Sequence, residues 1–272
     1  MNLPDADIIT TTARRAADTL RLHLNPVYLF MDAELKQLPE TWNRGEGTTL
    51  HEGRNTVRRM RLAGVDVAVK RYKRLGGLKR LIYTFFRPTK AIRGLVYSLE
   101  YRRRDIPSPE GIAAIEILRG GMVVDCYLVT VMSRGRNLFP ELVPVEDYDR
   151  NRVSNLADFL VTMHRRGVMN TDTNLSNLLV DATPATPFEC IDINRSVFTA
   201  ENFSYRSIVR NLARVTHRRD LLLTIVMRYA TTAGLHPQAM WDDVAAELDR
   251  FERKIAMRNR FKTIFRKKRT NH

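Results

Sequence analysis

The chain is poor in cysteine, and its two cysteines, Cys126 and Cys190, lie far apart in the 272 residues. They form no metal-like pair, so we interpret them as buried thiols of a cytosolic protein rather than as a disulfide framework. No run of about 18 apolar residues occurs, so we expect no transmembrane helix. Residues 1–7 are acidic and lack an apolar core, so we also expect no secretory signal peptide. Internal repeats and low-complexity segments are absent from the sequence.

Acidic residues are scarce relative to basic ones, which gives a net charge of +15. Between Arg58 and Arg104 there are fifteen Lys or Arg residues but only two acids, Asp66 and Glu100, which leaves a net +13 in one stretch. Residues 258–269 add seven more Lys or Arg residues. Such surfaces seek phosphate on nucleic acid or on an anionic membrane, although a generally basic solvated face is the simpler alternative. Because no recognition-helix motif and no basic strand with interleaved aromatics occurs, we expect no specific nucleic-acid partner.

The most informative pattern is an Asp, an Asn five residues later, an apolar strand, and a second Asp after another short apolar run. These residues are Asp172, Asn177 and Asp192. An Asp and an Asn at this spacing are by themselves typical of a turn. Together with the strand and the second Asp, they match the groups that phosphoryl transfer in the kinase fold requires: one carboxylate that accepts the hydroxyl proton, and an amide and a carboxylate that hold Mg²⁺.

Upstream elements complete the pattern. Residues 67–70 form a short apolar strand that ends in Lys70, the residue type that contacts the α- and β-phosphates of ATP in kinases. Alone, this segment would be an ordinary strand with a solvated lysine. Glu100 is the only acid on a helix expected over 89–104, where an ion pair to Lys70 is the role that a kinase requires. Residues 53–55 occupy the place of a phosphate-covering loop, but the Gly-x-Gly-x-x-Gly pattern is missing.

The remaining patterns predict an α+β, two-lobed protein-kinase-like fold with a small β-rich N-lobe and a mainly helical C-lobe. We divide the chain into a helical extension over 1–33, with its helix over 5–24, an N-lobe over 34–132, a C-lobe over 133–256 and a basic amphipathic tail over 257–272. The expected strands cover 57–62, 67–70, 112–118 and 122–132, and further helices cover 151–166, 205–215, 220–233 and 241–255.

Two features of the second half bear on the acceptor. About a dozen residues separate Asp192 from the next expected helix, and no Ala-Pro-Glu motif follows. A protein kinase needs a longer peptide-docking segment there, so we expect a small-molecule or glycan acceptor. His164, on the last turn of the helix over 151–166, is interpreted as a structural hydrogen-bonding residue rather than as a catalyst.

The chain resembles the lipopolysaccharide kinases, a family with a two-lobed kinase-like fold that phosphorylates Kdo or heptose sugars of the lipopolysaccharide inner core. The resemblance covers most of residues 40–215. It is carried by five segments, residues 53–55, 69–73, 106–113, 163–177 and 191–195. The last segment discriminates best, because typical protein kinases carry Phe-Gly after the Asp that corresponds to Asp192. The sequence departs from the family at Asn170, where kinases of this type place a supporting His, and in the residues from Thr173 to Asn177.

The resemblance implies a site that uses ATP and Mg²⁺. In it, Lys70 neutralises the nucleotide phosphates, Glu100 positions Lys70, and the loop of Gly53, Arg54 and Asn55 covers the phosphates. The metal ligands would be Asn177 and Asp192, and the proton acceptor would be Asp172. The implied acceptor is an inner-core glycolipid, which would place the enzyme in the cytoplasm, peripherally on the inner face of the inner membrane.

Two alternatives to this function stay open: a pseudokinase module that binds an anionic glycolipid or a partner protein, and a phosphotransferase for a small-molecule alcohol. The tail is also open to two interpretations. Met257, Phe261, Ile264 and Phe265 share one face of a helix with basic flanks, so that this face either binds an anionic membrane or packs on the C-lobe.

Overall fold

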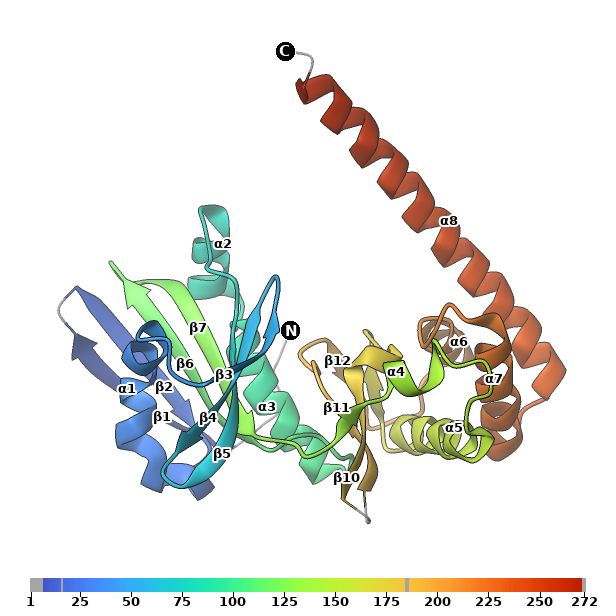
Figure 1. Cartoon of the computed structure of the whole chain (residues 1–272), viewed down its shortest axis with the longest axis horizontal. Coiled ribbons are helices and arrows are strands. Elements are labelled where there is room, and N and C mark those ends of the chain that lie inside the picture. The colour runs from blue at the N-terminus through green and yellow to red at the C-terminus, as the bar shows by residue number, and fades with distance from the viewer. Residues whose placement is uncertain (1–6, 16, 184–185, 271–272) are drawn as a thin grey trace. The chain divides into compact units, whose positions relative to one another are not determined.

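The computed structural model describes residues 7–15, 17–183 and 186–270. The chain folds into two compact units (Figure 1). Unit 1 consists of Met1–Arg136 and Leu179–Arg195, and unit 2 consists of Asn137–Leu178 and Ser196–His272. Residues 179–195 therefore belong to unit 1, although the sequence analysis assigned them to the second lobe.

Unit 1 is built on a seven-stranded antiparallel sheet with the order β1-β2-β6-β7-β5-β4-β3. Its strands are β1 (Ile9–Arg15), β2 (Asp18–Leu24), β3 (Thr48–Glu52), β4 (Thr56–Leu62), β5 (Val65–Arg71), β6 (Gly111–Arg119) and β7 (Met122–Val131). The expected strands over 57–62, 67–70, 112–118 and 122–132 are thus confirmed as β4, β5, β6 and β7.

The expected helix over residues 5–24 is wrong within the described part of this range, because the chain forms the β1–β2 hairpin there. Leu20, Leu22 and Leu24 are fully buried and alternate with polar residues, which is the period of a strand with one buried face. β1 is rich in β-branched residues, which favour strands. The hairpin pairs with β6 and extends the sheet by two strands.

Helices cover both faces of this sheet. They are η1 (Pro26–Met31), α1 (Asp32–Asn43), α2 (Leu78–Leu81), the π-helical turn η2 (Ile82–Phe86) and α3 (Lys90–Arg103). On one face, Leu35, Leu38 and Trp42 of α1 pack against Val67 and Val69 of β5 in the larger core. On the other face, Ala91 and Leu95 of α3 pack against β6 and β7 in a smaller cluster. The α3 helix confirms the helix expected over 89–104.

Both cysteines lie in unit 1 and are buried free thiols, as the sequence predicts. Burial raises the pKa of the Cys126 thiol to about 12. Cys190 ends β11 (Thr186–Cys190), which follows β10 (Leu178–Thr183) in a small sheet that also includes β8 (Arg136–Asn137). The backbone N–H of Cys190 donates to the Pro107 carbonyl, which joins this hairpin to the rest of unit 1.

Unit 2 is mainly helical. Its elements are α4 (Phe139–Leu142), α5 (Arg150–Arg165), β9 (Val168–Asn170), the 3₁₀ turn η3 (Leu175–Asn177), β12 (Ser196–Phe198), α6 (Tyr205–Leu212), α7 (Arg219–Ala233) and α8 (Pro237–Thr270). Leu156, Leu160 and Met163 form the buried face of α5, as their helical spacing predicts, and α5 packs on α7. The helices α5, α6 and α7 confirm three of the four expected helices, and α8 contains the fourth.

The long helix α8 has a buried beginning and an exposed continuation. Met240, Val244 and Leu248 recur every four residues and are fully buried, where α8 packs against α6 and α7. By Met257 the helix surface is exposed, and in Figure 1 the helix extends away from the other helices of unit 2. The side chains of 259–270 lie outside the described residues, so the two interpretations of the tail stay predictions. Within the part of the chain that the structure describes, no helix combines the length and the apolar character needed to cross a membrane.

Candidate active site

Lys70 lies on β5 and projects to the face of the sheet that α3 covers. Its cross-strand partner Leu128 packs into the α3 cluster, whereas the neighbouring Val69 packs under α1. Lys70 Nζ donates to Asp192 Oδ1 at 2.8 Å and lies 5.5 Å from the centre of the Tyr72 ring. The structure therefore brings together two predicted site residues that are 122 positions apart in the sequence.

Asp192 has a left-handed backbone with φ of 52°. This conformation is unfavourable for a non-glycine residue and persists only where the surroundings determine it. Asn194 contributes to this by donating from Nδ2 to the same Oδ1 atom that Lys70 contacts. Two donors thus orient one carboxylate oxygen of Asp192. Sequence reasoning had given Asn194 no role of its own.

The expected ion pair between Lys70 and Glu100 is absent among the described residues, and that prediction is wrong. Glu100 is almost fully buried, but its carboxylate binds Arg104 Nε at 2.6 Å and Arg103 Nη2 at 2.9 Å. Both arginines lie on the same helical face, three and four residues further along the chain, so the local pairs satisfy Glu100 within its own helix. The carboxylate that neutralises Lys70 comes from Asp192 instead.

Further cations surround Asp192. Burial lowers the pKa of Lys90, the first residue of α3, and nearby Arg54 and Arg195 lower it further, whereas Asp192 raises it. Arg93, one turn later on α3, also lowers this pKa, and its Nε is buried without a hydrogen-bond partner among the described residues. This concentration of positive charge around a single carboxylate suits a polyanionic ligand. The sequence analysis missed Lys90 and Arg93; their signal was a basic first turn on a helix that follows the lysine strand.

Residues 53–55 form the tip of the β3–β4 hairpin, the position expected for a phosphate-covering loop. The Arg54 guanidinium lowers the pKa of Lys90, so the hairpin tip adds positive charge near the beginning of α3. Asn55 Oδ1 accepts from the Lys73 backbone N–H at 3.2 Å, which ties the hairpin tip to the segment after β5. The nucleotide-binding role of Gly53 and Asn55 stays a prediction.

The loop that carries Asp172 lies in unit 2 and begins at Asn170, the last residue of β9. Asn170 is buried, and its Oδ1 accepts from the backbone N–H of Asp172 at 3.0 Å. The Asn170 carbonyl accepts from Asn211 Nδ2 at 2.7 Å and also from the Thr173 hydroxyl. Asn170 therefore supports the loop by hydrogen bonds, as kinases of this type do with the His expected at this position.

Asn177 closes the same loop. Its Nδ2 donates to the Asp172 carbonyl at 2.8 Å, and its backbone N–H donates to the Asn174 carbonyl. Because the amide nitrogen is used in this way, Oδ1 is the atom of Asn177 that remains for a hard cation. The structure thus joins Asp172 and Asn177 in one loop of unit 2, and Lys70 and Asp192 in one ion pair of unit 1.

A buried polar chain lies behind the loop, and the sequence analysis identified only one of its members. His164 contacts the Tyr229 hydroxyl through Nδ1 at 2.8 Å and Asn211 Oδ1 through Nε2 at 3.2 Å. Burial lowers the pKa of His164 to about 4, although its bond to Asn211 raises it. The structure supports the structural role expected for His164. Asn211 was missed; its signal was an amide on the apolar face that Ile208, Leu212 and Val215 mark in the helix over 205–215.

Comparison with known proteins places these residues in a fold. No protein-family model and no curated protein matches the chain. Among solved structures, WaaP in complex with acyl carrier protein covers 86% of this chain and 97% of its own, with a TM-score of 0.53 and 18% identity. A homolog of Stt7 from Micromonas algae, soaked with ATP, covers 54% of this chain and 48% of its own at 15% identity, with a TM-score of 0.40.

The likeness to WaaP shows the fold alone because the sequence identity is low. The chain has a kinase-like, two-lobed α+β fold, with an antiparallel sheet in the N-terminal part and helices in the C-terminal part. Within this fold, the β3–β4 hairpin tip, the end of β5 and residues 170–177 are the segments where the sequence analysis predicts the phosphate-covering loop, the lysine and the catalytic loop.

Proposed function

We propose that this protein is an ATP-dependent kinase that phosphorylates a sugar hydroxyl of the lipopolysaccharide inner core, on Kdo or heptose. The observation that carries the proposal is the ion pair between Lys70 and Asp192, in a chain whose Asp172 and Asn177 share a hydrogen-bonded loop. A lysine strand, an Asp-x₄-Asn loop and a second Asp occur here in the order and the structural context that phosphoryl transfer in this fold uses.

In the proposed reaction, the Asp172 carboxylate orients the acceptor hydroxyl and takes its proton as the oxygen attacks the γ-phosphorus of ATP and ADP leaves. Lys70 and the cations around Asp192 neutralise the phosphates. The protein forms no covalent intermediate in such a transfer, so positioning and charge neutralisation supply most of the rate. Asn170 and Asn177 contribute by holding the Asp172 backbone in place.

The donor set fits Mg²⁺, which would be held by the Asp192 carboxylate and the Asn177 amide oxygen together with nucleotide oxygens. When bound, the metal supplies charge neutralisation at the transferred phosphate. Among the described residues there is no group of three or more His, Cys, Asp or Glu residues that could bind a metal by themselves. A kinase site needs no such group, because the nucleotide contributes ligands.

The acceptor is inferred from the chain after Asp192. Residues 193–204 contain only the three-residue strand β12 before α6 begins at Tyr205. This leaves no segment of the length that protein kinases use to bind a peptide, so a glycan or a small alcohol fits better. The resemblance of the motifs to lipopolysaccharide kinases favours the glycan. A lipid-linked acceptor also suits the basic stretch 58–104, and we propose that the protein works peripherally on an anionic membrane surface in the cytoplasm, without a specific nucleic-acid partner.

The test combines the purified chain with Mg·ATP and lipopolysaccharide from cells that lack the protein, and mass spectrometry counts the added phosphates. We expect one phosphate on an inner-core sugar with the wild-type chain. Asp172→Ala should lower the transfer rate by about 10²–10⁴-fold, because it removes the proton acceptor. Asp147→Ala, which removes an exposed carboxylate of the same unit, is the matched control and should leave the rate unchanged.

The outcomes separate the competing functions. ATP binding without transfer to lipopolysaccharide or to small alcohols would identify a pseudokinase module. Transfer to a small alcohol alone would identify a small-molecule phosphotransferase. Transfer by Asp172→Ala within about twofold of the wild-type rate would remove Asp172 from the role of base.

A further inference from the structure

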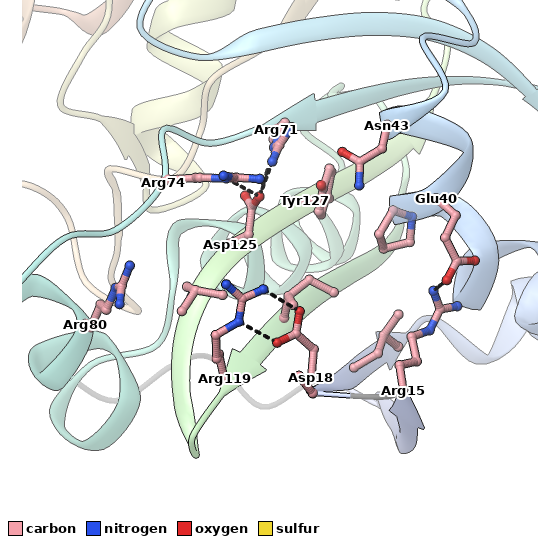
Figure 2. Close-up of a pocket in the computed structure, with 15 residues that line it drawn as sticks. Arg15, Asp18, Glu40, Asn43, Arg71, Arg74, Arg80, Arg119, Asp125 and Tyr127 are labelled. Atoms are coloured by element: carbon pink, nitrogen blue, oxygen red, sulfur yellow. Dashed lines mark hydrogen bonds and ion pairs between the residues drawn. The ribbon is translucent and has the colours of Figure 1, made fainter.

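A second basic site lies on the opposite face of the unit 1 sheet from Lys70. Arg71 follows Lys70 on β5 and projects to the other face, where its guanidinium lies 5.4 Å from the centre of the Tyr127 ring. A cavity of about 370 Å³ opens there, and five arginines and three acids line it (Figure 2). This cavity is distinct from the candidate active site because the sheet separates the two.

The charges in this cavity are unequally compensated. Arg119 forms a paired contact with Asp18, and Arg15 binds Glu40, so these four residues balance each other. At the other end, both Arg71 and Arg74 contact the Oδ2 atom of Asp125 (Figure 2). Arg80 also lines the cavity, on the side of Arg74 (Figure 2), and donates from Nε to the Leu75 carbonyl. Two guanidinium groups thus share the Asp125 carboxylate, which leaves a net positive end suited to a phosphate group.

An exposed apolar segment adjoins this positive end. Arg80 belongs to α2, and the neighbouring side chains of the α2–η2 segment (residues 78–86) face solvent: Leu78 is 73% exposed, Phe85 67% and Phe86 75%. The segment is attached to the sheet by polar contacts, because the Thr84 hydroxyl accepts from the Val123 backbone N–H at 3.0 Å and donates to the Arg80 carbonyl at 2.7 Å. Large apolar residues grouped at the surface mark a contact site.

We propose that the positive end of this cavity binds the phosphate of an anionic membrane lipid while Leu78, Phe85 and Phe86 of the α2–η2 segment enter the bilayer. The two features match the two parts of such a lipid, since arginines pair with phosphate oxygens and apolar side chains enter the acyl region. A soluble phosphate compound would use the arginines but would leave the apolar side chains exposed. The surface therefore fits a bilayer better than a soluble anion. The inference goes beyond the proposed phosphoryl transfer and holds whether or not the chain is active.

The test is sedimentation of the full chain with vesicles, without ATP, at low salt. We expect binding to vesicles that contain phosphatidylglycerol and little binding to pure phosphatidylcholine. The triple variant Leu78→Ser, Phe85→Ser, Phe86→Ser should bind these vesicles at least about tenfold more weakly than the wild type. Its matched control is Val27→Ser, Leu29→Ser, Phe30→Ser, which removes three apolar side chains of η1 that are 53–69% exposed, and which should bind like the wild type.

Charge is tested in the same way. Arg74→Glu should weaken binding about tenfold or more, whereas Arg61→Glu makes the same change of charge at an exposed residue of β4 outside the cavity and should have a clearly smaller effect. Far-ultraviolet circular dichroism checks that each variant is folded. The proposal is overturned if the α2–η2 and η1 variants bind alike, or if Arg74→Glu and Arg61→Glu bind alike. It is also overturned if inorganic pyrophosphate, at the concentration of the lipid phosphate, displaces the chain from vesicles, because the cavity would then prefer a soluble anion.

Discussion

The buried His164 makes the stability of unit 2 depend on pH. Its pKa is lowered from 6.5 to about 4, mainly because burial disfavours the charged imidazolium. The groups that face it are the uncharged Tyr229 hydroxyl, the Asn211 amide and the ring of Phe203. Between about pH 4 and pH 6.5 the unfolded chain therefore binds a proton at this residue that the folded chain does not bind. The stability that the buried, neutral His164 contributes to unit 2 is therefore fully present above pH 6.5 and is lost as the pH falls towards 4.

The size of the effect follows from the width of this pH interval. Each pKa unit corresponds to about 1.4 kcal/mol, so the full interval corresponds to about 3 kcal/mol of unfolding free energy. His164→Gln removes the titrating group and keeps a side chain that can hydrogen-bond to Tyr229 and Asn211. We expect the variant to be less stable than wild type at pH 7, by about 1–2 kcal/mol. As the pH falls to 4, the difference should change by about 3 kcal/mol and should reverse in sign, so that the variant becomes the more stable protein.

Urea unfolding at several pH values, followed by circular dichroism, gives both free energies. Carboxylates that titrate over the same interval contribute equally to both proteins and cancel in the difference. A difference that stays constant from pH 7 to pH 4 would refute the reasoning, because His164 would then titrate alike in the folded and unfolded chains.

Three further predictions concern the site and the tail. Asp192→Asn should weaken the binding of Mg·ATP in calorimetry, because a neutral oxygen replaces a charged ligand. The equally isosteric Glu100→Gln should leave the affinity for Mg·ATP within about twofold of wild type, since Glu100 does not contact Lys70. Equal losses of affinity in the two variants would contradict the assignment of Asp192 to the metal site. Asn211→Ala should lower the unfolding free energy by about 2–5 kcal/mol, because three buried groups, His164 Nε2, the Asn170 carbonyl and the Thr173 hydroxyl, each lose a hydrogen bond. Gln238→Ala, at an exposed amide, should change it by about 0.5 kcal/mol or less. Deletion of residues 257–272 should weaken vesicle binding at low salt by about 1 kcal/mol for each basic residue near the membrane surface, without lowering the melting temperature. Unchanged sedimentation with vesicles would show that the tail does not contact the membrane.

Local patterns predicted most of the elements correctly. Helical spacing identified α3, α5, α6 and α7, and alternating or continuous apolar runs identified β4 to β7, because each of these segments buries one face within its own unit. The β1–β2 hairpin was missed although β2 carries a local signal, the alternation of Leu20, Leu22 and Leu24 with polar residues. β1 contains threonine and arginine without an apolar stripe, so its place in the sheet depends on pairing with β2, which itself pairs with β6. Such long-range pairing cannot be read from a short stretch of sequence.

The site was predicted unevenly for a similar reason. Residue type and order predict Lys70, Asp172, Asn177 and Asp192 as site residues, and the structure pairs Lys70 with Asp192 and Asn177 with the Asp172 carbonyl. The partner of Lys70 was not predictable, because Glu100 stands three and four residues before two arginines that compete for its carboxylate. Whether Glu100 pairs with Lys70 or with its own arginines depends on the direction in which each side chain leaves the helix, and composition does not give that direction.

The polar groups behind Asp172 suggest why Asn170 can replace the usual histidine. The loop is held through the Asn170 side chain, which accepts from Asp172 N–H, and through the Asn170 carbonyl, which accepts from Asn211. Neither amide titrates, and His164, one step further back, is neutral around pH 7 because burial lowers its pKa to about 4. A histidine at position 170 would put a second titratable ring beside Asp172, the proposed proton acceptor. With an amide there, the hydrogen bonds that hold the Asp172 backbone are independent of pH near neutrality, so we expect the pH dependence of the proposed phosphoryl transfer to come from the reacting groups rather than from their support.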